Sequence, residues 1–349
     1  MKLSEISEFE LINRFKKIIK DTSLGDDILV TIGDDAAVCK LEKKNTYTLI
    51  STDSLLENVH FKFTYAQPYT VGCKAVYVNV SDIAAMGGIP KYLLISVSAK
   101  KDLSLSLLED IYKGIVRASN KYRIKIIGGN TSSGCNDLAI NITIIGSIEK
   151  KHIVTRSGAK TGDLIVVTGS IGEAYAGFKV LQGDIKPTNN LKKCIKKHLL
   201  PEPRVNEGRL IAVKGLATSM IDISDGLASD LGHLLTESKK GARIYANQIP
   251  ISPQTKKIAK IFNDAPLDYA LYGGEDYELL FTLPPQKLGK CLNYFKQNSF
   301  FPPTVIGEIE VDKERFVIIN ETGQEYPLTK KGFDHFQCSP LTKKLISYY

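Results

Sequence analysis

Apolar residues along the chain recur with two periods, one typical of strands and one typical of helices. The run TYTLIST at 46–52 alternates apolar and polar residues, as a half-buried strand does, and Asp53 is expected to end it. Residues 71–86 have apolar positions at helical spacing, and the glycines and proline that follow predict the end of a helix. The same patterns predict further strands at 124–127, 138–148, 164–169 and 219–224, and further helices at 104–122, 172–181, within 191–214 and from 225 onward.

Strands that alternate with helices favour an α/β or α+β fold. The polar segment EKKHIVTRSGAKTGD at 149–163 separates two such sets of elements. The chain has 349 residues, which is more than one hydrophobic core usually serves. We therefore predict two domains, residues 1–149 and residues 150–349, the second of them α/β.

Composition narrows the class of protein. The chain has 43% hydrophobic and 24% charged residues, as globular proteins do, and no run approaches the roughly 18 apolar residues of a membrane span. Ser7 and Glu10 have the spacing of a capping box at the start of an amphipathic helix, unlike a signal peptide. The six cysteines are scattered and form no CxxC pair, which fits a reducing compartment. We expect a cytoplasmic protein that has no membrane partner.

The formal net charge of +8 suggests either a nucleic-acid partner or a small polyanionic substrate. The lysines are spread along the chain in pairs, and no basic tract is interleaved with aromatic residues. The sequence therefore favours no nucleic-acid partner, and a small anionic substrate accounts for the charge equally well.

Acidic residues recur at the ends of the predicted elements and in glycine turns. Several carboxylates in one cleft would repel each other unless a cation compensated them, and oxygen ligands suit Mg²⁺ or Mn²⁺ rather than zinc. Each acid also has a structural alternative: Asp225 could cap its helix, Asp53 could lie in a turn, and Asp82 could pair with a lysine. Together they predict a nucleotide–magnesium site, formed by Asp34, Asp35, Asp53, Asp82, Asp222, Asp225, Glu275 and Asp276.

Phosphate-binding loops are the complementary feature. A Walker A sequence and a GxGxxG motif are both absent. Glycine-rich segments that could present N–H groups to a phosphate remain at 128–134, 224–226 and 272–282. Arg156 could clamp a phosphate or simply lie at the surface. Among the five histidines no metal-binding spacing occurs, and His60 is better placed than His233 to contact a substrate.

Motifs in this order resemble the thiamine-monophosphate kinase family, over about residues 6 to 336. The motifs are IGDDAAV, STDSLLENVHF, VNVSDIAAMGGIP, IIGGNTSSG, VTRSGAKTGD, MIDISDGLASDLGHLL, GGEDYELLFT and KGFDHF. The wider group that they resemble contains aminoimidazole ribonucleotide synthetase, selenophosphate synthetase and the hydrogenase maturation dehydratase. The resemblance implies an N-terminal domain with a mixed sheet that pairs across a homodimer, a C-terminal α/β domain, and an ATP site in the cleft.

The resemblance also implies an activity, the last step of thiamine diphosphate biosynthesis. The γ-phosphoryl group of ATP is transferred to thiamine monophosphate, with several Mg²⁺ ions per site and with ATP as co-substrate. No residue is expected to act as a general base or to carry the phosphoryl group. By motif, the metal ligands are Asp35, Ser51, Thr52, Asp53, Asp82, Asn130, Asp222 and Asp225. The implied ATP contacts are Tyr112, Gly129, Asn130, Arg156 and Ser224, and the implied substrate contacts are His60, Glu275 and Phe333.

One position departs from the family pattern. Many members have GGD where this chain has GGN at 128–130, so Asn130 keeps an oxygen ligand but lacks the charge. Two alternatives remain at this point. One is another ATP-dependent member of the wider group, although the chain lacks a reactive cysteine in an N-terminal glycine loop and ends in LISYY without a terminal cysteine. The other is a nucleotide or nucleic-acid sensor without turnover.

Overall fold

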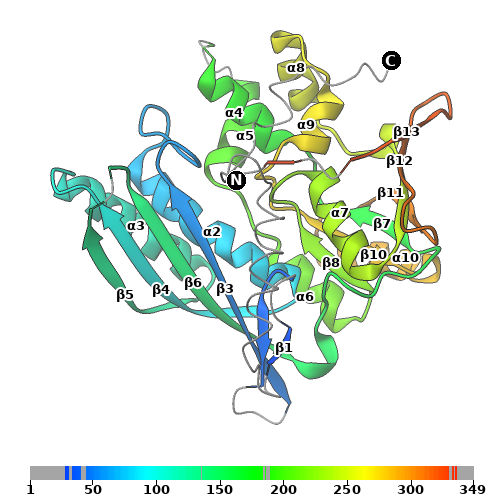
Figure 1. Cartoon of the computed structure of the whole chain (residues 1–349), viewed down its shortest axis with the longest axis horizontal. Coiled ribbons are helices and arrows are strands. Elements are labelled where there is room, and N and C mark those ends of the chain that lie inside the picture. Colours follow the sequence, from blue (N-terminus) through cyan, green and yellow to red (C-terminus); the bar gives the residue numbers. More distant parts are fainter. Residues whose placement is uncertain are drawn as a thin grey trace, which may run out of the picture.

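Two mixed β-sheets with their helices form the described part of the protein (Figure 1). The computed structural model describes residues 28–30, 34–40, 45–134, 136–183, 185, 189–329, 332–333 and 335. The helix expected around Ser7 and Glu10 lies outside the described residues. Within them, no helix combines the length and the apolar character needed to cross a membrane.

The first sheet comes from the N-terminal part of the chain and has a buried and an open face. In spatial order its strands are β1 (Ile28–Val30), β2 (Ala37–Cys39), β3 (Thr46–Leu56), β6 (Ala139–Glu149), β4 (Ile89–Ala99) and β5 (Lys125–Ser133). Along β6 buried and partly exposed residues alternate, and Ile140, Ile142 and Ile144 point into the core. β4 and β5 run parallel and are joined by α3 (Leu105–Lys121), and the other pairs of neighbouring strands are antiparallel.

Helix α2 (Pro68–Ala85) lies between this sheet and the C-terminal half. It packs against β3, β6 and α3 on one side and against α6 (Val205–Val213) and β8 (Ser219–Asp222) on the other. Glycines allow this close packing. A Cβ atom at Gly72 would lie 1.9 Å from the Ile111 carbonyl oxygen, and one at Gly208 would lie 2.3 Å from the Ala84 carbonyl oxygen. The helix is buried almost throughout, and the amide of its buried Asn79 donates to the Ala75 carbonyl at 2.9 Å.

The second sheet has helices on both faces. Ile221 and Leu280 pack with α7 (Leu227–Ser238) and α9 (Pro266–Tyr272), whereas the adjacent Met220 and Phe281 pack with α6 and α10 (Leu288–Gln297). α4 (Glu173–Gln182), α5 (Asn189–Leu199) and α8 (Pro253–Phe262) form a further apolar cluster with Tyr269 of α9. In spatial order the strands are β13 (Glu325–Pro327), β12 (Phe316–Ile319), β9 (Gly241–Tyr245), β11 (Thr304–Glu310), β7 (Leu164–Val167), β10 (Leu279–Leu283) and β8.

The mixed α/β fold with two sheets confirms the predicted fold class. The division at residue 149 stays a prediction. Two local predictions were wrong. Asp53 does not end its strand, because β3 continues to Leu56 and pairs with β6 along its whole length. The glycine-rich segment at 128–133 is not a loop but the second half of β5, because Gly129 can lie against the Ile95 carbonyl of β4, where a Cβ atom would lie 1.9 Å away.

Candidate active site

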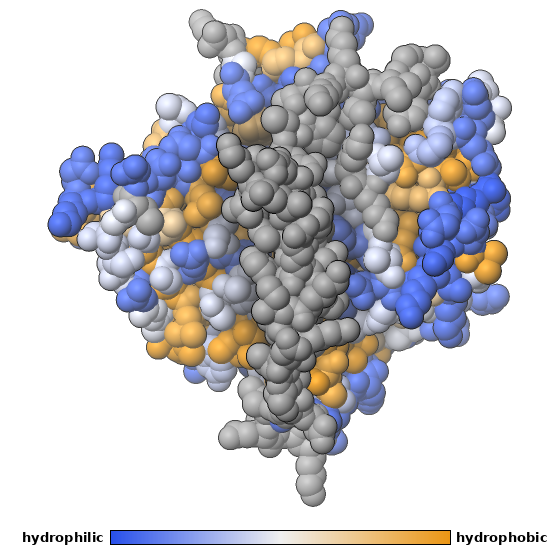
Figure 2. All heavy atoms as spheres, in the orientation of Figure 1, coloured by the Kyte–Doolittle hydropathy of each residue, from blue (hydrophilic) through white to orange (hydrophobic). Residues whose placement is uncertain are grey.

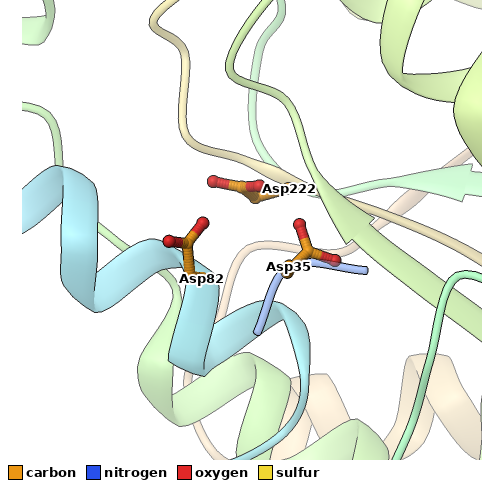
Figure 3. Close-up of side chains that lie close together, drawn as sticks. All are labelled: Asp35, Asp82 and Asp222. Carbon is orange, nitrogen blue, oxygen red and sulfur yellow. The ribbon is translucent and has the colours of Figure 1, made fainter. Parts of the chain in front are cut away.

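Three aspartates from distant parts of the chain meet where the two halves touch. Asp35 precedes β2, Asp82 lies in the last turn of α2, and Asp222 ends β8. Each offers one carboxylate oxygen, and these three oxygens lie within 4.8 Å of one another. Figure 3 shows the three side chains pointing toward one another from three separate segments. All three belong to the set of acids that the sequence analysis assigned to one site, and the structure brings these three together.

These carboxylates are not stable together as free anions. Burial raises the pKa of Asp82 well above its ordinary value, and the charges of Asp53, Asp222 and Asp35 raise it further. Burial followed by the charge of Asp35 does the same to the pKa of Asp222. A cation among them removes this penalty, and a donor set made only of oxygen atoms fits Mg²⁺.

Strand β3 adds two more polar residues to the site. The Ser51 hydroxyl donates to Asp82 Oδ2 at 2.5 Å, and the Asp53 N–H donates to Asn79 Oδ1 of α2 at 3.1 Å. Since successive side chains of a strand point to opposite faces, Thr52 faces away from α2. Its hydroxyl donates to the Ile142 carbonyl instead. The structure therefore brings Ser51 and Asp53 to the cluster but not the Thr52 hydroxyl, and a metal contact through Thr52 stays a prediction.

Contacts with Arg156 hold in place the segment before β2 that contains Asp34 and Asp35. Arg156 Nε and Nη2 donate to the two oxygens of Asp35 at 3.1 and 2.9 Å. The Asp34 side chain accepts from the backbone N–H groups of Asp35 and Arg156, and so it holds the turn between them in shape. Burial, followed by the charge of Asp35, raises the pKa of Asp34 to about 7. A guanidinium has five donors, so its pair with Asp35 leaves room for a phosphate contact.

The segment between β8 and α7 contains Ser224 and Asp225. The N-cap residue of α7 is Gly226, not Asp225. Asp230, in the first turn, accepts from the N–H groups of Asp225 and Gly226, both at 3.1 Å. Asp230 did not stand out among the acidic residues of the sequence. Its place in the first turn of a predicted helix, where a carboxylate is favourable, is the signal that could have found it.

The GGEDYE segment at 273–278 connects the acidic cluster of Asp35, Asp82 and Asp222 to a second group of polar residues around Glu275. The Glu275 N–H donates to the Ser224 carbonyl at 2.7 Å, which ties this segment to the end of β8. The Glu275 carboxylate contacts Lys74 Nζ of α2 at 2.6 Å and His198 Nδ1 of α5 at 2.8 Å. Neither Lys74 nor His198 stood out in the sequence, because a buried lysine or histidine has no local pattern.

Three aromatic rings lie beside this group. The ring centroids of His60 and Phe333 are 6.4 Å apart, and His335 lies 5.0 Å from His60 and 4.8 Å from Phe333. Phe333 is 37% exposed, and its N–H donates to the Asp225 carbonyl at 3.0 Å. Burial lowers the pKa of His60 to about 4, and its Nδ1 accepts from the Leu56 N–H, so the ring is neutral at pH 7. The predicted substrate residues His60, Glu275 and Phe333 thus lie in one region. The ring of His335, which was not among the predicted residues, lies beside them.

Three predicted ATP or metal residues lie elsewhere in this chain. Asp53 pairs with Ile142 of β6, Ile142 with Ile95 of β4, and Ile95 with Gly129 of β5. Three strand spacings of about 4.8 Å separate Gly129 from Asp53 by roughly 14 Å. Asn130 is the next residue of this edge strand, and Tyr112 packs from α3 against the N-terminal core. Within one chain, the structure does not bring Gly129, Asn130 or Tyr112 to the acidic cluster, and their roles stay predictions.

Models of two protein domains match the two halves of the chain. The AIR synthase related protein N-terminal domain matches residues 33–148, and its C-terminal domain matches residues 160–320. The acidic cluster therefore takes Asp35 and Asp82 from the first matched domain and Asp222 from the second.

Relatives over nearly the whole chain share one activity in their names. A thiamine-monophosphate kinase of Buchnera aphidicola subsp. Schizaphis graminum is 41% identical over 95% of this chain and 99% of its own. That of Bacillus subtilis strain 168 is 35% identical over 95% and 100%. A solved complex of AaThiL with AMPPCP and TMP superposes with a TM-score of 0.82 at 34% identity, over 96% of this chain and 99% of the other. The chain belongs to the thiamine-monophosphate kinase family.

Proposed function

We propose that the chain transfers the γ-phosphoryl group of ATP to thiamine monophosphate and so forms thiamine diphosphate and ADP. The observation that carries this proposal is the meeting of Asp35, Asp82 and Asp222 between the two matched domains, in a chain that aligns with thiamine-monophosphate kinases almost from end to end. The solved AaThiL complex with AMPPCP, an ATP analogue, and TMP supports both substrates.

Direct in-line transfer needs no catalytic base here. The acceptor is a phosphate monoester with a second pKa near ~6, so it is largely dianionic at pH 7 and already nucleophilic. His60 is neutral and accepts a backbone N–H, which suits a contact residue rather than a proton acceptor. The difficulty of the reaction is the repulsion between two groups of phosphates, so the required contribution is electrostatic.

The chain's own residues divide that work between two regions. The carboxylates of Asp35, Asp82 and Asp222, with Asp53 beside them, hold Mg²⁺, which screens the phosphates when it is bound. Asp225 follows Asp222 in the segment before α7, and its backbone carbonyl accepts from the Phe333 N–H. Glu275, His60 and Phe333 hold the organic part of thiamine monophosphate, since aromatic faces suit heteroaromatic rings and neutral His60 adds no repulsion to the thiazolium cation.

A direct assay tests the activity. The purified protein is incubated with ATP and Mg²⁺ together with thiamine monophosphate, with thiamine or without an acceptor, and ADP and thiamine diphosphate are measured. We expect equal amounts of ADP and thiamine diphosphate with thiamine monophosphate, and only background with the other two. ADP formation that does not depend on thiamine monophosphate would refute the acceptor.

We propose further that two copies of the chain form a homodimer through the first sheet. Its edge strand β5 is exposed along its whole length, and apolar residues lie on the open face or at the edge of the sheet. Orange apolar patches are visible over this part of the molecule in Figure 2. A second copy would cover them and could bring its own Gly129 and Asn130 to the distant site. The exposed apolar residues are Ile89, Tyr92, Leu94, Ile126 and Ile127.

The proposed dimer predicts the mass of the particle in solution and predicts that a charged substitution in the contact weakens the association. Light scattering after gel filtration should give about twice the chain mass of 38.5 kDa. Leu94→Glu, on the open face of β4, should shift the protein toward the monomer because a charge would be buried in the contact. Ile261→Glu on α8, 47% exposed and far from the first sheet in sequence, is the control. A wild-type monomer at micromolar concentration contradicts the proposal.

A further inference from the structure

Lys74 is a buried lysine at the junction of the two halves. It comes from α2 of the N-terminal half and is only 2% exposed. Its Nζ lies 2.6 Å from Glu275 Oε1 in the C-terminal half and donates to the backbone carbonyl of His60 at 3.4 Å. An ammonium group is almost never buried unless it is paired, so these two contacts account for its position. Lys74 therefore joins the side chain of one predicted substrate residue to the backbone of another.

Glu275 is held rigidly on its own side as well. Its φ is +69°, a left-handed conformation that a non-glycine residue adopts only when its surroundings enforce it. The backbone around it is fixed against the end of β8, since Glu275 donates to the Ser224 carbonyl and Tyr277 donates to the Ile223 carbonyl. His198 contacts the second carboxylate oxygen at 2.8 Å. The carboxylate is thus held from both sides, while its side chain remains 23% exposed.

The charge state of Glu275 follows from the same contacts. Burial by itself would raise the pKa of Glu275, but Lys74 and then His198 outweigh it and keep the pKa well below the ordinary range. The carboxylate is therefore an anion at neutral pH. A carboxylate has about four lone-pair sites, so the contacts with Lys74 and His198 leave acceptor capacity for a donor group of a ligand.

We propose that Lys74 is a positioning residue for the acceptor substrate: it fixes the Glu275 carboxylate and the His60 backbone in one arrangement across the junction. This inference rests on the proposed function, because it assigns to Lys74 the recognition of the organic part of thiamine monophosphate. On that part of the substrate, the Glu275 carboxylate binds a hydrogen-bond donor or a cationic group.

The acidic cluster does not depend on Lys74 in the same way. Asp82 lies on the same helix, but its carboxylate accepts from Ser51, and Asn79 ties α2 to β3 at Asp53. These contacts fix the nucleotide side of the site independently of Glu275. Loss of the Lys74 ammonium should consequently weaken the binding of the acceptor while leaving the binding of ATP unchanged, a difference that a general loss of structure would not produce.

The test compares Lys74→Met with wild type in steady-state kinetics. Methionine keeps the apolar stem and removes the charge. We expect the KM for thiamine monophosphate to rise about tenfold or more, which corresponds to about 1.4 kcal/mol, with the KM for ATP and kcat within about twofold. Lys179→Met is the matched control. Lys179 lies on α4 and pairs with Asp264 at 2.9 Å, so its replacement removes a paired lysine elsewhere and should leave both KM values unchanged. Equal increases in both KM values, or no increase, would overturn the proposal.

A double-mutant cycle with Glu275→Gln adds a second test. Lys74→Met also removes the contact with the His60 carbonyl, in either background. If Lys74 acts through Glu275, Lys74→Met should raise the KM for thiamine monophosphate by a smaller factor in the Glu275→Gln background than in wild type. Fully additive effects would refute this. Lys74→Met leaves the Glu275 carboxylate without its cation and could prevent folding. The double variant removes both charges, so the comparison between it and Glu275→Gln then tests the proposal. A wild type that forms no thiamine diphosphate refutes the proposed function, whereas an active wild type with unaffected variants refutes only the role of Lys74.

Discussion

Asp222→Asn should lower kcat by a factor on the order of 10³ while the metal-free protein becomes no less stable. Asparagine has nearly the same shape but removes one charge from the cluster that it forms with Asp35 and Asp82. The remaining carboxylates bind Mg²⁺ more weakly, so the repulsion between ATP and the acceptor is no longer screened. In the metal-free protein the same substitution relieves the repulsion between buried anions.

The stability half of this prediction has a definite pH dependence. The pKa of Asp222 in the folded protein lies well above its ordinary value of 3.8. Its contribution to stability is therefore complete below that ordinary value and is lost as the pH rises toward the folded-state pKa. The melting temperature of metal-free Asp222→Asn should consequently exceed that of metal-free wild type by more at neutral pH than at acid pH.

Two measurements check the prediction. Turnover is followed as thiamine diphosphate formation, and melting is followed with and without Mg²⁺ in the presence of ATP. Wild type should gain stability from Mg²⁺ and lose turnover when the metal is chelated, and Asp222→Asn should show little of either response. Asp110→Asn, in an exposed pair with Lys113 on α3, is the control that should behave as wild type. Turnover of Asp222→Asn within tenfold of wild type would rule out this site.

Arg204→Met should lower the free energy of unfolding by about 3 kcal/mol, because it breaks a buried ion pair. Glu278 is 1% exposed, and its two oxygens accept from Arg204 Nε and Nη2 at 2.6 Å each. Burial alone would raise the pKa of Glu278, but Lys197 and then Arg204 lower it to about 2, so the carboxylate is charged. Lys197 stays as a partner at 2.5 Å, which places the expected cost at the lower end of the range for such pairs.

Urea unfolding followed by circular dichroism measures this cost. The control is Arg315→Met, since Arg315 and Glu325 form a pair of the same kind whose side chains are 38% and 43% exposed. Exposed pairs contribute at most about 1 kcal/mol, so this variant should remain close to wild type. Equal changes in the free energy of unfolding in the two variants would show that the buried pair of Arg204 and Glu278 contributes no more to stability than an exposed pair does.

Local patterns predicted most elements because helices and strands that pack on one core repeat their apolar residues at a fixed period. The helix at 71–86 and the strand at 138–148 appear as α2 and β6, nearly residue for residue. The errors occurred where tertiary contacts overrode a local signal. Asp53 and the glycines at 128–129 are typical of strand ends, yet both lie inside strands because a neighbouring strand pairs with them.

The sequence by itself determined the family, the two-sheet α/β class and the set of carboxylates, because motifs, periodicity and residue chemistry are local properties. Only the tertiary structure decided which of these residues meet. It joined Asp35, Asp82 and Asp222, and it kept Gly129 roughly 14 Å from Asp53 within one chain. It also supplied Lys74, His198 and Asp230, whose partners lie on other elements or turns. The physical reason is that burial and charge pairing depend on distances through space, which spacing along a chain does not fix.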